Sequence, residues 1–134
     1  MDLYAQNIMD HFKSPHNKGR LSHPSATRHE ANHSCGDILD VDLAITNGVV
    51  TDVKYEGQGC AISQSAMSIL SDELKNKTMA DILDLTESDV HAYLGVPITA
   101  RRRKCALLSL LTVKNALLTH EGKEPLAWVD LVEE

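Results

Sequence analysis

The chain has 134 residues, of which 43% are hydrophobic and 24% are charged. This is the size and composition of one ordinary globular domain, so we expect a single domain over residues 1–134. The formal net charge of −6 argues against a nucleic-acid-binding domain, which normally has a basic balance. No apolar run approaches the roughly 18 residues that span a membrane, and residues 1–20 lack the apolar segment of a signal peptide. We therefore expect a cytoplasmic protein with no membrane and no nucleic acid as partner.

A short amphipathic helix is predicted over residues 2–13, because Tyr4, Ile8 and Phe12 recur at helical spacing. Ser14 and Pro15 interrupt this pattern. Residues 14–34 are rich in His, Asn, Ser, Pro and Gly, which predicts a long irregular stretch. In a compact domain such a stretch is usually functional or mobile.

A β-hairpin follows. Hydrophobic residues 39, 41, 43 and 45 alternate with polar ones and should share one face of a strand. Asn47-Gly48 is the strongest short hairpin signal, because both central residues of a type I′ turn have positive φ. The returning strand should place residues 49, 51, 53 and 55 on one face and residues 50, 52, 54 and 56 on the other.

Helices dominate the rest of the chain. We predict one from residue 60 to about 74, and a short one opened by the capping pattern Thr78-x-x-Asp81. Two more are predicted over residues 88–94 and 102–120, the last ended by Gly122 and Pro125. Strands followed by helices indicate an α+β fold with one layer of each.

Residues 29–33 read H-E-A-N-H, which matches the H-E-x-x-H zinc-peptidase pattern. That pattern works only on a helix, where residues i and i+4 face a single zinc ion. Here the segment follows Pro24, leads into a predicted strand and lacks apolar periodicity. We therefore interpret it as a solvated polar loop, not as a peptidase site.

The three cysteines are a better candidate for chemistry. Their odd number predicts free thiols, although the number alone also fits three small buried residues. Each lies at the end of a predicted element: Cys35 before a strand, Cys60 after the hairpin, and Cys105 in the first turn of a helix. A thiolate at such a position can face solvent, and a helix N-terminus lowers the pKa of the Cys60 and Cys105 thiols.

A basic run, Arg101-Arg102-Arg103-Lys104, precedes Cys105. One interpretation is a solvated charge run, which we favour for Arg101 and Arg103. The other is an anchor for an acidic partner that also lowers the pKa of Cys105. Four basic residues in an acidic chain are a weak indication of nucleic-acid binding.

Three motifs together resemble a known family. Cys35-Gly36-Asp37, Gly57-Gln58-Gly59-Cys60-Ala61 and Arg102-Arg103-Lys104-Cys105 are similar to the three signatures of the U-type iron–sulfur assembly proteins, which are IscU, SufU and the N-terminal domain of NifU. The opening segment from Tyr4 to Gly19 resembles the first helix and loop of that family. The resemblance extends over nearly the whole chain, in the right order.

The resemblance implies an α+β fold with a small antiparallel β-sheet packed against helices. It also implies that Cys35, Cys60 and Cys105 carry sulfur and metal, with Asp37 as the carboxylate ligand of the same site. Thiolates bind both iron–sulfur clusters and zinc, and an oxygen ligand loosens the site. The implied partners are a cysteine desulfurase, recipient apoproteins and, for a bridging cluster, a second copy in a homodimer.

Two functions follow from these residues. The leading hypothesis is a scaffold, not an enzyme, that assembles a [2Fe–2S] cluster on Cys35, Asp37, Cys60 and Cys105 and transfers it to apoproteins. The alternative is a SufU-type sulfur acceptor that holds Zn²⁺ on the same residues and activates the desulfurase. A purely structural zinc module is less expected, because the aspartate and the glycine-flanked thiols indicate an exchangeable site.

The subgroup stays open on sequence alone. IscU proteins have a histidine immediately before the third cysteine, whereas Lys104 resembles the Arg-x-Lys-Cys of SufU. The short spacing between Cys60 and Cys105 resembles IscU instead. The Leu-Pro-Pro-Val-Lys segment that IscU presents to its chaperone is replaced here by residues 95–99. His33 is either a further ligand or a residue that shapes the loop before Cys35.

Overall fold

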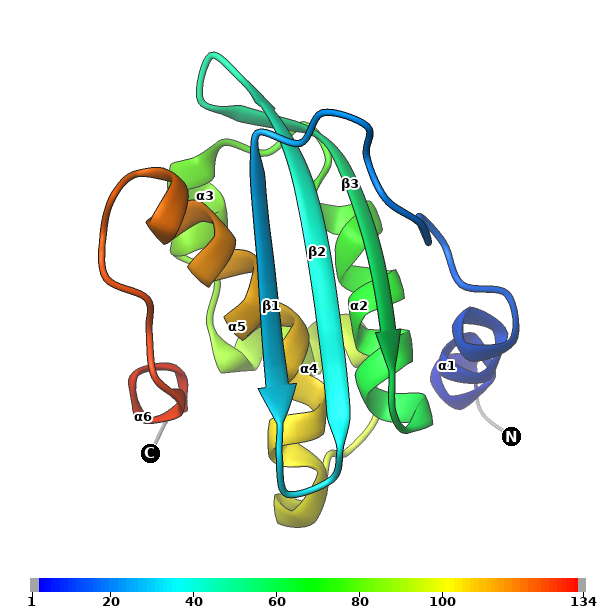
Figure 1. Ribbon diagram of the computed structural model, residues 1–134. Coiled ribbons are helices and arrows are strands. Elements are labelled where there is room, and N and C mark those ends of the chain that lie inside the picture. The colour runs from blue at the N-terminus through cyan, green and yellow to red at the C-terminus, as the bar shows by residue number, and fades with distance from the viewer. Residues whose placement is uncertain (1–2, 133–134) are drawn as a thin grey trace.

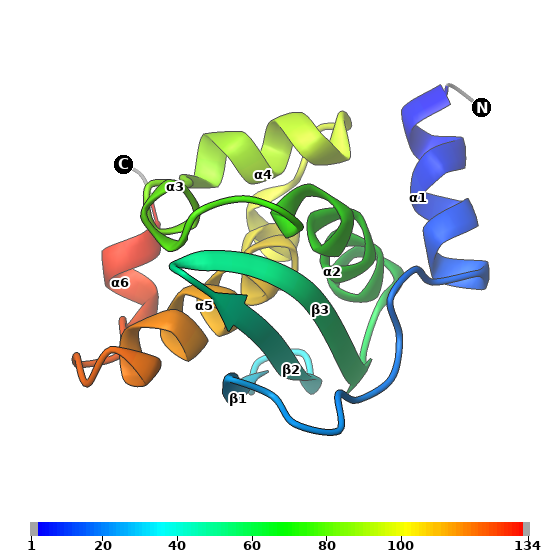
Figure 2. The ribbon, with the colours of Figure 1, turned by 90° about the horizontal axis from the view of Figure 1, so that it is seen from above.

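Three antiparallel strands form one sheet, and helices cover one of its two faces (Figure 1). The computed structural model describes residues 3–132. Viewed from above, the strands make one layer and the main helices the other (Figure 2). The predicted α+β fold with a small antiparallel sheet is therefore confirmed. The sheet has the order β1-β2-β3, with β1 at Ala26–Asn32, β2 at Asp37–Thr46 and β3 at Val49–Gln58.

The helices match the predicted ones within a few residues. Helices α2 and α5 pack against each other and against the sheet, while α1 packs on α2. The predicted first residue of α1, Asp2, lies outside the described residues. The short α6, near the C-terminus, was not predicted. The helical elements are α1 (Leu3–Lys13), α2 (Ala61–Leu74), α3 (Met79–Leu83), α4 (Glu87–Leu94), the 3₁₀ turn η1 (Ala100–Arg102), α5 (Arg103–His120) and α6 (Trp128–Leu131).

Strand β1 corrects the prediction of an irregular stretch over residues 14–34. It pairs with β2 from Ala26 opposite Leu43 to Asn32 opposite Asp37. Only Ala26 and Asn32 of its residues are buried, so its own sequence lacks the apolar alternation that indicates a strand. The pairing depends on the hydrogen-bonding edge that β2 offers.

The same strand shows that the H-E-A-N-H segment is not the solvated loop we predicted, although it is equally unsuited to a peptidase site. His29 Nδ1 lies 2.9 Å from Asp40 Oδ1 on the neighbouring strand. Glu30 accepts hydrogen bonds from Arg28 and from Asn115 of α5. Residues four apart in an extended strand are separated by roughly 13 Å, which is too far for two ligands of one zinc ion.

The hairpin between β2 and β3 is confirmed, with one correction. Asn47 and Gly48 have φ values of 52° and 76°, as a type I′ turn requires. A β-bulge leaves Thr51 unpaired, because Ala44 faces Asp52 and Ile45 faces Val50. The bulge reverses the alternation at this end of β3, so Val50 is buried and Thr51 is exposed.

Helix α5 is the centre of the core. Its residues from Cys105 to Leu117 are all buried, because α2, α4 and the sheet surround it. Two polar residues within this stretch bond to the helix itself: Ser109 donates to the Ala106 carbonyl and Thr112 to the Leu108 carbonyl. Cys105, in the first turn of α5, lies near Asn32 at the end of β1.

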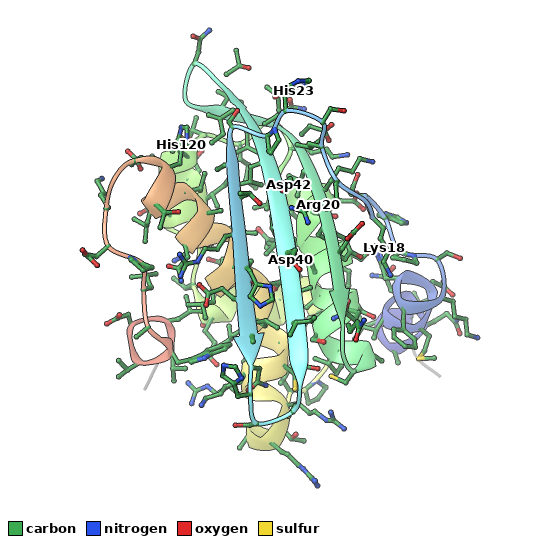
Figure 3. All side chains as sticks on the ribbon, in the orientation of Figure 1. Lys18, Arg20, His23, Asp40, Asp42 and His120 are labelled. Atoms are coloured by element: carbon green, nitrogen blue, oxygen red, sulfur yellow. The ribbon has the colours of Figure 1, made fainter. Side chains whose placement is uncertain are left out.

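The segment after α1 is fixed to the outer face of the sheet by Asp42 (Figure 3). This carboxylate is 1% exposed. It accepts hydrogen bonds from Arg20 at 2.8 and 2.9 Å, from the Leu21 N–H at 3.0 Å and from Thr27 at 2.8 Å. The Arg20 guanidinium, together with Thr27 and the Leu21 N–H, lowers the pKa of Asp42 against the opposing effect of burial.

We predict that Asp42→Asn lowers the free energy of unfolding by about 2–3 kcal/mol at neutral pH. This is less than the ~3–5 kcal/mol of a fully buried pair, because the Arg20 side chain is 46% exposed. Chemical denaturation at several pH values measures the loss. The folded pKa of Asp42 lies below its ordinary value of 3.8, so its stabilising effect is present above pH 3.8 and disappears as the pH falls through the folded value. The difference in the free energy of unfolding between the wild-type protein and Asp42→Asn should therefore shrink as the pH falls below 3.8.

Asp40→Asn, on the same strand, is the control. An equal loss of stability in Asp40→Asn and Asp42→Asn would contradict the role of Asp42.

Candidate metal and cluster site

Cys35 lies in the turn that joins β1 to β2. The N–H groups of Cys35 and Gly36 donate to the Asn32 carbonyl at 3.2 and 2.9 Å. Gly36 has a φ of +76°, a conformation that glycine adopts without strain. This tight turn leaves the Cys35 thiol exposed at the end of the sheet where β1 leads into β2.

Asp37 is the first residue of β2 and is fully buried. Its Oδ1 accepts a hydrogen bond from the Cys60 N–H at 3.0 Å and one from Ser63 Oγ at 3.2 Å. Its Oδ2 has a longer contact of 3.4 Å with Asn32 Nδ2. One oxygen is therefore fully engaged with the start of α2, and the other is only weakly held.

Gly59 makes this approach of α2 to Asp37 possible. A Cβ atom at Gly59 would overlap Asp37 Oδ1 and would lie 2.7 Å from Ser63 Oγ. The backbone at this residue also has a φ of +154°. This glycine therefore allows the backbone before α2 to lie directly against Asp37.

The structure gathers Cys35, Asp37 and Cys105. One donor atom from each lies within 4.8 Å of the other two. Cys60, the N-cap residue of α2, is half-buried. It is not part of that compact set of donors. It nevertheless lies close enough to Cys105 to raise the pKa of the Cys105 thiol. Three segments that are distant in sequence therefore place all four predicted residues at one end of the sheet.

Cys105 differs from the prediction in two ways. Its thiol is fully buried, so it does not face solvent. Burial raises its pKa, and hydrogen bonds with Asp37 and Cys35 raise it further. The helix N-terminus and the basic run therefore do not produce the low pKa that we predicted, because desolvation and neighbouring acidic groups outweigh them.

Three residues of the basic run, Arg102, Arg103 and Lys104, have different surroundings. Arg102 is exposed and lies beside the sulfur atoms of Cys105 and Cys60, which raise its pKa, Cys105 having the larger effect. Arg103 is not a solvated charge, because its guanidinium bonds both oxygens of the buried Glu87 at 2.5 Å. The Lys104 ammonium lies 5.7 Å from the centre of the Trp128 ring of α6.

Two residues outside the four predicted ligands support the site. Asn32 is 2% exposed and its amide nitrogen lies 3.8 Å from Cys105 Sγ as well as near Asp37. Ser63 holds Asp37 from the first turn of α2. Their only sequence signal is proximity to Cys35 and Cys60. His33 is exposed and does not belong to the compact set of donors.

The chain belongs to the family described as the NifU-like N terminal domain, whose model matches residues 3–126. The zinc-dependent sulfurtransferase SufU of Bacillus subtilis is 31% identical, over 90% of this chain and 92% of that protein. The iron–sulfur cluster assembly scaffold protein IscU of Thermotoga maritima is 28% identical, over 86% and 92%. The resemblance inferred from the three motifs is therefore confirmed.

Solved structures agree with this assignment. The N-terminal NifU-like protein of Brucella abortus superposes with a TM-score of 0.74 at 21% identity, covering 91% of this chain and 96% of that one, which shows a shared fold. A structure named as an iron–sulfur cluster assembly scaffold for the SUF system, from Fervidobacterium islandicum, gives a TM-score of 0.71 at 26% identity, covering 84% and 94%. Among residues 3–132, none of the helices is long and apolar enough to cross a membrane.

We predict that Gly59→Ala disrupts this site. The added methyl group must displace Asp37 or Ser63, at a cost of about 1–3 kcal/mol for overpacking beyond the roughly 1 kcal/mol expected for an alanine at positive φ. Gly122→Ala is the matched control, since Gly122 also has a positive φ, +74°, but open space around its Cα. Thermal unfolding and metal-binding assays measure both effects. Equal destabilisation and unchanged metal binding in the two variants would contradict the role of Gly59.

Proposed function

We propose that this chain is a scaffold, not an enzyme, that assembles a [2Fe–2S] cluster on Cys35, Asp37, Cys60 and Cys105 and passes it to apoproteins. The observation that supports this most strongly is the convergence of Cys35, Asp37 and Cys105 within 4.8 Å, with Cys60 adjacent. Thiolate sulfur is the usual ligand of such clusters. The relatives named as IscU scaffold proteins support the same proposal.

The arrangement of Asp37 supports release of the cluster as well as its assembly. Oδ1 is engaged by Cys60 and Ser63, which leaves the weakly held Oδ2 as the oxygen that can bind a metal. An oxygen donor binds iron less tightly than a fourth thiolate. The exposed Cys35 and half-buried Cys60 keep one side of the site open to an incoming or departing partner.

The proposal requires partners that supply sulfur and accept the finished cluster. We assign the first role to a cysteine desulfurase and the second to apoproteins with free cysteines. A homodimer, in which two copies contribute ligands to one bridging cluster, is the matching assembly. The exposed position of Cys35 supports contact with the desulfurase, with an apoprotein or with a second copy of the chain.

Asp37→Ala should retain a reconstituted cluster longer than the wild-type protein does, because the variant lacks the weak oxygen ligand that favours release. The measurement is the loss of visible absorption over time in the presence of a metal chelator or an apo-acceptor, under anaerobic conditions. Asp40→Ala, on the outer face of β2, should lose its cluster at the wild-type rate. Faster loss from Asp37→Ala than from both reference proteins would contradict the release role of Asp37.

A zinc-binding sulfur acceptor of the SufU type is the second candidate. Three donors within 4.8 Å of one another suit a single tetrahedral ion, in which neighbouring ligands lie about 3.3 Å or slightly more apart. Lys104 before Cys105, and the SufU relative at 31% identity, favour this candidate. Sulfur transfer would then proceed by attack of a thiolate on the outer sulfur of the desulfurase persulfide. A new S–S bond forms, the old one breaks, and the desulfurase cysteine leaves as a thiolate.

In that function Cys35 should take the sulfur first, because it is the exposed thiol while Cys105 is buried. Mass spectrometry after a single turnover with a desulfurase should place the added sulfur on the Cys35 peptide. Cys35→Ser should abolish transfer, whereas Ser34→Ala, at the neighbouring exposed position, should not. Persulfide found first on Cys105 in the wild-type protein would contradict this order of transfer.

A further inference from the structure

A second group of potential ligands lies away from the cysteines. One donor atom each from His11 of α1, His16 of the following turn and Asp72 of α2 lies within 4.8 Å of the other two. Asp72 is twelve positions after Cys60, which corresponds to roughly 18 Å along a helix. This cluster is therefore spatially separate from the proposed cluster-assembly site.

Ser68 of α2 fixes both histidines. Its hydroxyl is fully buried and lies 2.6 Å from His11 Nδ1, and it accepts the His16 N–H at 2.8 Å. The His11 ring is itself buried, at 8% exposure, and its centre lies 4.3 Å from that of the His16 ring. A hydrogen bond to a second ring atom is the usual way in which proteins orient a metal-binding histidine.

The carboxylate of Asp72 is held in the same way. Asn17, in the left-handed conformation with φ of 59°, donates to Asp72 Oδ1 at 2.8 Å and to Ser71 Oγ at 2.8 Å. Asp72 Oδ2 faces His16 Nδ1 at 2.5 Å. One carboxylate oxygen is thus occupied by a supporting residue and the other is directed at the histidines.

An unsatisfied polar atom lies beside the cluster. The Tyr55 hydroxyl is buried and lies beside the Ser68 hydroxyl, but within residues 3–132 it makes no hydrogen bond of good geometry. Burial raises the pKa of Tyr55, an effect that the adjacent Ser68 hydroxyl opposes. Buried polar groups without a partner are uncommon and often indicate a missing water, ion or ligand.

The charges around the cluster favour a cation. The carboxylates of Asp72 and Asp10 both lie close enough to the His11 ring to add negative potential there. The nearby Lys75 ammonium is bonded to Asn17 Oδ1 and lies 3.9 Å from Asp52. The Asp52 carboxylate therefore offsets part of its charge.

We propose that His11, His16 and Asp72 form a binding site for a divalent first-row transition metal, Zn²⁺ or Fe²⁺. Two imidazoles and one carboxylate are a common three-residue ligand set for both ions. Ca²⁺ and Mg²⁺ are disfavoured because they select oxygen ligands. The donor atoms must approach to about 3.3 Å for tetrahedral coordination, and the half-exposed side chains of His16 and Asp72 have the freedom to do so around the fixed His11. We assign the fourth coordination position to a water molecule close to the Tyr55 hydroxyl.

The test is a titration of the full chain, first loaded with one equivalent of Zn²⁺ to fill the cysteine site. Further Zn²⁺ is added and followed by calorimetry and by NMR of the histidine ring nitrogens, and Fe²⁺ is added anaerobically in a parallel experiment. The His11 and His16 rings should shift, or broaden with Fe²⁺, as a second equivalent binds. His16→Gln and Asp72→Asn should each weaken this second binding at least tenfold.

His29→Gln is the matched control, because His29 and Asp40 form an exposed pair of the same kind at 2.9 Å that belongs to no described three-donor group. It should leave the second binding unchanged. Selective response of His11 and His16 to either ion supports the proposal. It is overturned if neither ion affects these rings, or if His29→Gln weakens binding as much as His16→Gln does. Because all variants retain the four cysteine-site residues, failure here is distinguishable from failure of the proposed function.

Discussion

The buried carboxylate of Asp37 is the interaction around which this end of the molecule is organised. It is a charged group with no exposed surface, and such a group is tolerated only when hydrogen bonds replace its water. The Cys60 N–H, Ser63 and Asn32 supply those bonds. Asp37 therefore joins the start of β2, the end of β1 and the N-terminus of α2, while Cys105 approaches from α5.

This arrangement explains why a small sheet and two packed helices suffice to form the site. Each cysteine comes from the end of a different element, and the elements are held by a core centred on α5. The cysteines differ in accessibility in a graded way: Cys35 is exposed, Cys60 is half-buried and Cys105 is buried. A site with one fixed buried thiol and one exposed thiol is suited to holding a sulfur-rich cargo while leaving one side accessible. The family to which the chain belongs includes relatives named both as cluster scaffolds and as a zinc-dependent sulfurtransferase.

The sequence predicted those parts of the structure that local chemistry determines. Asn47-Gly48 defined the hairpin through its positive φ angles, and helical spacing located α2 and α5. Strand β1 was missed because its pairing comes from the edge of β2 rather than from its own alternation. The pKa of Cys105 was predicted in the wrong direction because its burial depends on the packing of α5, which no local pattern reveals. Likewise, the pairing of Arg103 with Glu87 joins two helices across a separation of 16 residues.

The most direct test of the proposed cluster-assembly site is iron, zinc and sulfide analysis, with a visible spectrum, of protein purified anaerobically and then reconstituted with a desulfurase. Our interpretation predicts iron and sulfide in equal amounts with the absorption of a [2Fe–2S] chromophore, and loss of both in Cys105→Ser. Tightly bound zinc without a chromophore would instead favour the sulfur-acceptor function at the same residues. A protein that binds neither iron nor zinc, or whose binding is unchanged by Cys105→Ser, would contradict the assignment of this site.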